Sequence, residues 1–247
     1  MNGMFANCNQ LTDLDLSSFN TSNVRTMEAM FFRCVNLTNL NISSFDTSKV
    51  TNMQDMFIRC EKLSELDLSN FDTSNVTNMQ AMFRACIGLK KLNVKNFNTE
   101  KVTNMSGMFA ACEQLTELDV SNFNTSKVTD MLQMFQLMYS LEKLDLSNFD
   151  TQQVTNMYYM FSSCKNLTEL DVSNFNIKNV TDLEAIFLGC ISLKKLNISK
   201  MDLTNYEGET AKIFLDIPKT VEIITNEEMK KWINKNYSVY SNIKVEE

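Results

Sequence analysis

The hydrophobic positions of this chain repeat every 26 residues, and each period contains two patterns in succession. The first half, for example "LSELDLSNF" at 63–71, alternates apolar and polar side chains, which is typical of a short strand. The second half spaces its apolar side chains at i, i+3, i+7 and i+10, which places them on one stripe of a helix. In the same period these are Val76, Met79, Phe83 and Cys86. Each period therefore predicts a strand followed by a short helix.

Three columns of side chains keep the 26-residue step along most of the chain. All seven cysteines share one column: Cys8, Cys34, Cys60, Cys86, Cys112, Cys164 and Cys190, with Met138 in the remaining place. A second column is Phe19, Phe45, Phe71, Phe97, Phe123, Phe149 and Phe175, ending at Met201, and a third is Leu14, Leu40, Leu66, Leu92, Leu118, Leu144, Leu170 and Leu196. A fixed period of this length predicts a solenoid, because a single turn cannot bury its apolar face alone.

The predicted fold is an α/β solenoid of the leucine-rich-repeat type with about eight turns of 26 residues. We expect a parallel sheet on one face and short α or 3₁₀ helices on the other. Capping boxes support the helices in three turns, where a threonine precedes a glutamine or glutamate by three residues. These are Thr51 with Gln54, Thr77 with Gln80 and Thr181 with Glu184.

The two ends of the chain differ. Residues 1–203 form the predicted solenoid, and residues 204–247 form a predicted C-terminal strand–helix–strand cap. In this cap "KTVEIITN" (219–226) and "YSVYSNIKVEE" (237–247) predict strands, and Thr225 with Glu228 predicts the start of a helix running to about Lys235. Trp232 is expected to cover the core of the last turn. The N-terminal residues 1–4 align with 27–30, so the chain is expected to begin within a turn, without a secretory signal, as a segment of a longer protein.

Composition narrows the function. The net charge of −7 does not favour binding to nucleic acid or to an anionic bilayer, and no apolar run is long enough to span a membrane. The chain has no histidine, the commonest general base and metal ligand in proteins. We therefore expect no catalytic residues, no cofactor and no enzyme activity.

The cysteine column is interpreted as structural. Its thiols would lie about 5 Å apart along the stack, but parallel side chains in a packed column rarely offer the torsion of a disulfide. Metal sites use close pairs such as C-x-x-C, and the sequence has none. We expect a buried, reduced ladder of thiols that reacts slowly with thiol reagents, and no metal site.

Two columns follow the exposed face of the predicted sheet. One is Asp13, Asn39, Glu65, Lys91, Glu117, Lys143, Glu169 and Lys195, in which opposite charges alternate and are expected to compensate each other. In the neighbouring column Asp119, Asp145 and Asp171 stand in successive turns. This strip is a candidate binding site for a hard cation such as Ca²⁺ or for hydroxyl or ammonium groups of a partner. The alternative, which we favour, is a solvated polar face, because a flat strip offers fewer oxygens than Ca²⁺ takes.

A second candidate surface lies on the predicted helical side. Outward positions that are small or polar in early turns become Leu132, Tyr158 and Tyr159, near Tyr139. Clustered exposed aromatic side chains are typical of a contact surface. The alternative is that neighbouring helices pack these side chains between them.

The segment "LDLSNFDTSNVTNMQAMF" (66–83) closely resembles the BspA-like leucine-rich-repeat surface proteins, whose repeat is abundant in mycoplasma and firmicute surface lipoproteins. The resemblance covers about residues 1–203. It implies a location at the cell surface or outside the cell and a non-enzymatic role in adhesion or protein binding, with a host or neighbouring-cell protein or glycan as partner. It supplies no binding residues. A rigid structural spacer without a ligand is the alternative function, and the uncapped N-terminal turn could make an end-to-end contact.

Overall fold

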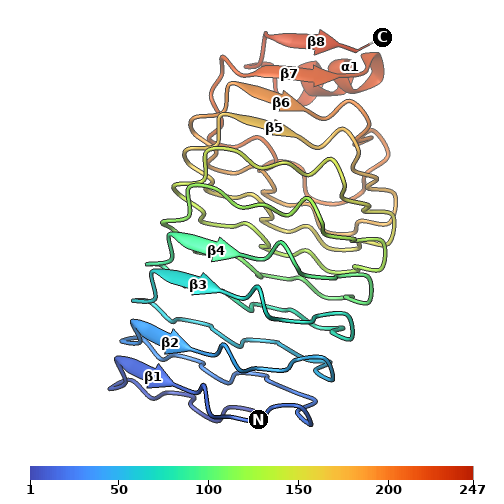
Figure 1. Ribbon diagram of the computed structural model, residues 1–247. Helices are drawn as coiled ribbons and strands as arrows, with labels where there is room; N and C mark the ends of the chain where they lie inside the picture. The colour runs from blue at the N-terminus through green and yellow to red at the C-terminus, as the bar shows by residue number, and fades with distance from the viewer. Residues whose placement is uncertain (247) are drawn as a thin grey trace.

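The computed structural model describes residues 1–246, which wind into coils stacked along one axis (Figure 1). The two chain ends lie at opposite ends of the stack. We number coils 1 to 8 by the segments that carry the sheet face, which begin at Asp13, Asn39, Glu65, Lys91, Glu117, Lys143, Glu169 and Lys195. The predicted solenoid is confirmed.

Parallel strands form one side of the stack. They are β1 (Asp13–Asp15), β2 (Asn39–Asn41), β3 (Glu65–Asp67), β4 (Lys91–Asn93), β5 (Glu169–Asp171) and β6 (Lys195–Asn197). Paired strands are consecutive in the chain, and their register joins residues 26 apart, as in Leu66 with Leu92. The ladder is interrupted: β1 pairs with β2, β3 with β4, and β5 with β6, whereas coils 5 and 6 carry no assigned strand.

The opposite side of the coils is built from turns, and the predicted short helices are absent from it among residues 1–221. The N–H of Ala81 donates to the carbonyl of Ser106 in the next coil (2.8 Å), and the following N–H, of Met82, turns back to Met79 (3.2 Å). This alternation recurs in the other coils and ties each coil to its neighbour. A helix would use its N–H groups within itself, and its diameter of about 10 Å would force the coils further apart on this side than the strand spacing of about 4.8 Å, which these bonds between coils do not allow.

The predicted capping boxes are also wrong, because the threonine hydroxyls serve another purpose. The hydroxyl and the N–H of Thr77 both donate to the carbonyl of Thr51 in the preceding coil. The N–H of Gln80 is bound instead by the side-chain oxygen of Asn78 (2.9 Å). The threonines therefore connect coils rather than starting helices.

Left-handed backbone conformations close the turns. They fall at two positions four residues apart in most coils and are occupied mainly by residues other than glycine: Ala29, Arg33, Asp55, Arg59, Ala81, Ala85, Ala111, Gln133, Leu137, Tyr159, Ser163 and Ala185. Gly107 and Gly189 occupy two of the remaining positions. Because an L side chain pays about 1–2 kcal/mol in this region, the turn side stores strain that the core packing must offset.

Buried columns of like side chains fill the interior, as predicted. Phe57 and Phe83 stack with ring centroids 5.8 Å apart and planes 4° from parallel, and this stacking continues coil by coil from Phe5 to Phe187 and on to Phe214. The methionine, valine and inner leucine columns are buried beside them. A full side chain of this size removed from water contributes about 1.5–3 kcal/mol, so each added coil is stabilised by contact with the previous one.

The cysteine column is a buried hydrogen-bonded ladder. The thiol of Cys86 donates to the carbonyl of Phe57 (3.1 Å), and the thiol of Cys112 to that of Phe83 (3.2 Å). Burial raises the pKa of the Cys86 thiol to about 12, so these thiols stay protonated near neutral pH. Cys8, at the first coil, differs because it is only half-buried.

The C-terminal segment continues the stack. β7 (Glu222–Thr225) and β8 (Ile243–Val245) add to the sheet after β6, and helix α1 (Glu227–Asn236) lies between them. The N-cap of α1 is Asn226, whose side chain accepts from Met229 (2.8 Å), and not the predicted Thr225, which is buried under the helix start. Trp232 is half-buried against the core. Among residues 1–246, no helix is long and apolar enough to cross a bilayer.

Replacing Ala111 (φ 58°) by glycine is expected to raise the free energy of unfolding by about 0.5–1 kcal/mol, because glycine carries no penalty in the left-handed region. Ala110→Gly is the matched control. Its methyl group is buried and its φ is negative, so this variant is expected to lower stability by about 1 kcal/mol. Chemical denaturation measures both. An equal loss in the two variants would contradict the assigned backbone.

Thiol labelling of the native protein is expected to show one fast thiol, that of Cys8, and six that react only after unfolding. In a Cys8→Ser variant the fast phase should disappear. Several fast thiols remaining in that variant would show that the column is open to solvent.

Candidate binding site on the sheet face

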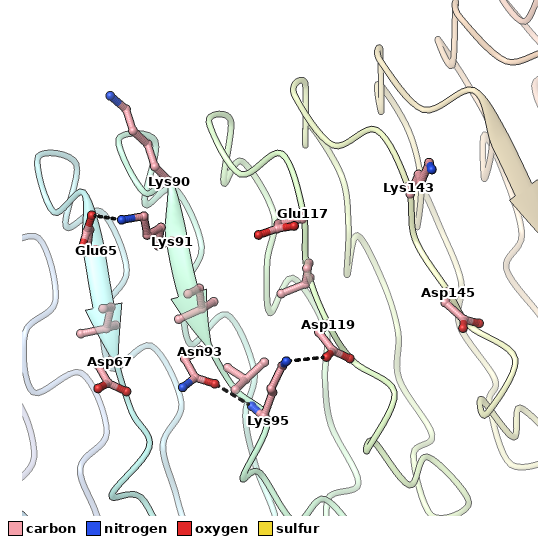
Figure 2. A pocket seen from close by; sticks show the side chains of 14 residues that line it. Glu65, Asp67, Lys90, Lys91, Asn93, Lys95, Glu117, Asp119, Lys143 and Asp145 are labelled. Atoms are coloured by element: carbon pink, nitrogen blue, oxygen red, sulfur yellow. Dashed lines mark hydrogen bonds and ion pairs between the residues drawn. The ribbon is translucent and has the colours of Figure 1, made fainter.

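A groove of about 750 Å³ crosses the sheet face over coils 3 to 6 (Figure 2). Its apolar lining is Leu66, Leu92, Val94 and Leu118, from coils 3 to 5. Its rim carries charged side chains of both signs: Glu65, Asp67, Lys90, Lys91, Lys95, Glu117, Asp119, Lys143 and Asp145. Of the predicted strip, Asp119 and Asp145 line the groove, whereas Asp171 lies one coil beyond it.

A double repeat of 52 residues organises this face. Odd coils carry an acidic segment that ends in aspartate, as in Glu65-Leu-Asp67 and Glu169-Leu-Asp171. Even coils carry a neutral or basic one that ends in asparagine, as in Lys91-Leu-Asn93 and Lys195-Leu-Asn197, which pair with them. Coils 5 and 6 depart from this rule, because Asp145 stands where coils 2, 4 and 8 have asparagine. In this double coil two carboxylates therefore face each other.

The departure falls in the two coils that carry no assigned strand. In the last double coil the amide of Asn197 donates to Asp171 (3.2 Å), a bond that one carboxylate cannot make to another. Asp119 and Asp145 repel each other instead. The charge of Asp119 raises the pKa of Asp145, although the hydrogen bonds from Ser147 lower it by more. Coils 5 and 6 are joined here by the N–H of Glu142, which donates to Thr116 (3.2 Å), without an assigned strand pair.

Each aspartate of the strip also terminates its own strand segment. One oxygen of Asp119, Asp145 or Asp171 accepts the N–H of the serine two residues on, at 3.1, 2.9 and 2.8 Å. This is an Asx turn, which asparagine forms equally well in coils 2 and 4. The turn accounts for the residue type at this position, so the strip itself does not identify a site.

The second carboxylate oxygen distinguishes the three residues. Asp119 contacts the ammonium group of Lys95 (3.4 Å), and Asp171 accepts from Asn197. For Asp145 the described residues provide no ion pair and no second hydrogen-bond donor within bonding distance. The hydrogen bonds from Ser147 hold the pKa of Asp145 below its ordinary value, so the exposed carboxylate is ionised at neutral pH.

The expected alternation of ion pairs is realised in one place. Lys91 bridges Glu65 (2.7 Å), but within residues 1–246 no salt bridge joins Lys143 to Glu117 or Lys195 to Glu169. The groove therefore combines two ion pairs, Lys91 with Glu65 and Lys95 with Asp119, with charged side chains that form none within residues 1–246. Figure 2 shows Lys143 and Asp145 near each other on coil 6, each without a drawn partner.

The sequence interpretation placed Lys91 and Lys143 on this face as compensated charges but missed Lys90 and Lys95, although the columns contain a signal for Lys95. Lys95 interrupts a column that is otherwise serine: Ser17, Ser43, Ser69, Ser121, Ser147, Ser173 and Ser199. It reaches across to Asp119 in the next coil (Figure 2). Comparing each position with its own column, rather than with other proteins, would have found it.

Leu132, Tyr158 and Tyr159 lie on the turn side, away from the sheet face, and are half-buried. The rings of Tyr158 and Tyr159 are 4.2 Å apart, and the hydrogen bond between them raises the pKa of Tyr158. Tyr139 is covered by Lys165, whose ammonium group lies 4.0 Å from the ring centroid. The six predicted residues therefore belong to two separate surfaces.

Metal binding has no support from side-chain geometry in residues 1–246, where no three acidic or thiol groups cluster closely enough to hold an ion. The carboxylates of the strip are spread along the stack and are committed to Asx turns.

Ser121→Ala is expected to move the pKa of Asp119 upward, toward the ordinary aspartate value. The Ser121 hydroxyl (2.7 Å) is the first cause of its lowered pKa, and the variant keeps the N–H bond. Carbon-detected NMR titration measures the shift. An unchanged Asp119 pKa would mean that this hydroxyl does not bind the carboxylate.

Three solved structures are similar to this chain. A leucine-rich repeat protein from Bacteroides ovatus is 15% identical, with a TM-score of 0.53; the alignment covers 100% of this chain and 63% of that one. A leucine rich cell surface protein from Faecalibacterium prausnitzii is 15% identical over 100% of this chain and 76% of its own, with a TM-score of 0.30. The pneumococcal vaccine antigen PcpA is 16% identical over 96% and 72%, with a TM-score of 0.37.

No curated protein matches the chain significantly. The Bacteroides ovatus structure shows a shared fold, and this chain spans less than two thirds of its length. The family model described as "Mycoplasma protein of unknown function, DUF285" matches residues 1–117 and 103–226, which is most of the chain. The chain therefore belongs to the DUF285 family of mycoplasma proteins and has a leucine-rich-repeat solenoid fold.

Proposed function

We propose that this chain is a non-enzymatic, surface-exposed module that binds another macromolecule through the groove on its sheet face. The observation that carries the proposal is the set of groove charges that form no ion pair within residues 1–246, namely Asp67, Lys90, Glu117, Lys143 and Asp145. Free charges of both signs on a rigid floor favour specific recognition of a partner with complementary charges. The resemblance of residues 66–83 to BspA-like surface proteins supports a location outside the cell.

The carboxylates of the groove suit binding better than acid–base catalysis. The pKa values of Asp119 and Asp145 are lowered by hydrogen bonds from Ser121 and Ser147. A general acid needs the opposite, a carboxyl group whose pKa is raised toward neutral pH by burial. Both carboxylates lie on an open face, so they are prepared to form ion pairs.

A rigid spacer is the second candidate, and the regularity of the stack favours it. The Thr73 hydroxyl donates to the carbonyl of Asn98 (3.0 Å) and accepts its N–H (2.7 Å), and the same arrangement recurs in most coils. Together with the thiol and phenylalanine columns, these bonds make a stiff rod. A spacer would need no free charges on either surface.

Attachment of beads coated with the chain to cultured animal cells tests the proposal. The triple variant Asp119→Asn, Asp145→Asn, Asp171→Asn keeps the Asx turns and removes three charges, so it is expected to reduce attachment about three- to tenfold. The matched control is Tyr158→Ser with Tyr159→Asn on the turn side, which should attach normally.

Loss of attachment in the tyrosine variant alone would move the binding surface to the turn side. Unchanged attachment in both variants, or no attachment by the wild-type chain, would favour the spacer.

A further inference from the structure

We propose that the groove binds an extended segment of a partner protein in which a basic side chain docks on Asp145 and an acidic side chain two positions away docks on Lys143. This inference rests on the proposed function and names the chemistry of the partner. It follows from the repeat itself, from the unpaired groups of coil 6 and from the spacing of those groups.

Each residue of the groove can be compared with the residues at the equivalent position in the other coils. A residue whose only role is to maintain the stack is expected to be the same type as the equivalent residues of the other coils. A residue that differs from them without stabilising the stack is a candidate for a role in binding. On coil 6, Asp145 replaces the asparagine of the other even coils, and Glu142 replaces the lysine found in coils 4 and 8. Both changes add negative charge to the same coil. Asp145 also places a second carboxylate beside Asp119, and the repulsion between them weakens the stack rather than supporting it.

In coil 4 a lysine in the serine column directs a partner's basic group to Asp145 rather than to Asp119. Lys95 replaces a serine and pairs with Asp119 (3.4 Å), so that of the two neighbouring aspartates of coils 5 and 6 only Asp145 is without an ion pair within residues 1–246. One Asp145 oxygen accepts from Ser147 (2.9 Å), and the other faces the groove without a partner among residues 1–246. A partner cation therefore finds one open carboxylate beside one that is already neutralised.

Lys143 completes the pattern. It lies two residues before Asp145 on the same face, and Figure 2 shows both side chains on coil 6 with no partner drawn. Residues i and i+2 of an extended chain are about 6.6–6.8 Å apart on one face. A partner segment in the same extended conformation repeats this spacing, so one acidic and one basic residue separated by a single residue match Lys143 and Asp145 together.

The occupant is a polypeptide rather than a polysaccharide, because the site pairs free charges of opposite sign at strand spacing. An anionic polysaccharide would bind Lys143 and Lys90 but would be repelled by Asp145 and Glu117. A neutral glycan would use none of these charges. Exposed ion pairs change a dissociation constant by about 1.5- to 5-fold each, so a single segment is expected to bind weakly.

The test uses four fluorescent nine-residue peptides that differ only at two central positions: Lys-Thr-Glu, Glu-Thr-Lys, Lys-Thr-Lys and Glu-Thr-Glu. Binding to the full chain is followed by NMR chemical-shift changes of coil 6 and by fluorescence anisotropy at low salt. One of the two mixed-charge peptides is expected to bind at least threefold tighter than either like-charge peptide. The identity of the tighter mixed-charge peptide will show whether the bound segment runs in the same direction as coil 6 or in the opposite direction.

Asp145→Asn is the decisive variant, because asparagine is native at this position in coils 2, 4 and 8 and the fold is therefore retained. It is expected to weaken the preferred peptide about threefold. Asp67→Asn, the same change at the other end of the groove, is the matched control and should leave the affinity within about 1.5-fold. Lys143→Gln should remove the preference between mixed-charge and like-charge peptides.

Equal binding of all four peptides, or equal effects of Asp145→Asn and Asp67→Asn, would overturn the inference. Heparin binding with no peptide binding would also overturn it, because the lysines would then serve an anionic polysaccharide. If the peptides fail while the triple aspartate variant still reduces cell attachment, the proposed function survives and this inference alone is wrong.

Discussion

Hydrogen bonding between successive coils is the constraint on which the rest of the structure depends. On the sheet side strands pair with residues 26 positions away, and on the turn side every second N–H reaches the next coil. Because both sides are bonded, the coils are held at strand spacing all around their circumference. This spacing forces each side chain onto the equivalent side chain of the next coil, so phenylalanine stacks on phenylalanine and thiol lies above thiol.

The stack explains how much of the fold could be predicted. The period, the parallel register and the buried columns follow from the sequence because a 26-residue step leaves no other way to bury Phe83 and Cys86 in every coil. The prediction of helices was wrong because buried side chains at i, i+3 and i+7 are produced both by a helix and by consecutive turns that contain left-handed residues. The left-handed residue Ala81 gives no glycine signal, and only the bonding of its N–H to Ser106 distinguishes the two structures.

The binding surface was harder to predict for a related reason. Asp119 and Asp145 were identified by their charge, but most of their surroundings are explained by Asx turns that asparagine also forms. The informative feature is the exception: Lys95 in a serine column, and Asp145 where the double repeat has asparagine. In a protein made of near-identical coils, positions that match their column maintain the rod, and positions that depart from it are free to serve recognition.

Scalar couplings across hydrogen bonds, measured by NMR on the deuterated chain, test the central claim most directly. The account predicts couplings from the N–H of Ala81 to the carbonyl of Ser106 and from Phe83 to Met108, each reaching 25 residues forward into the next coil. Couplings from these N–H groups to carbonyls four residues earlier would show helices on the turn side and would contradict the bonded stack.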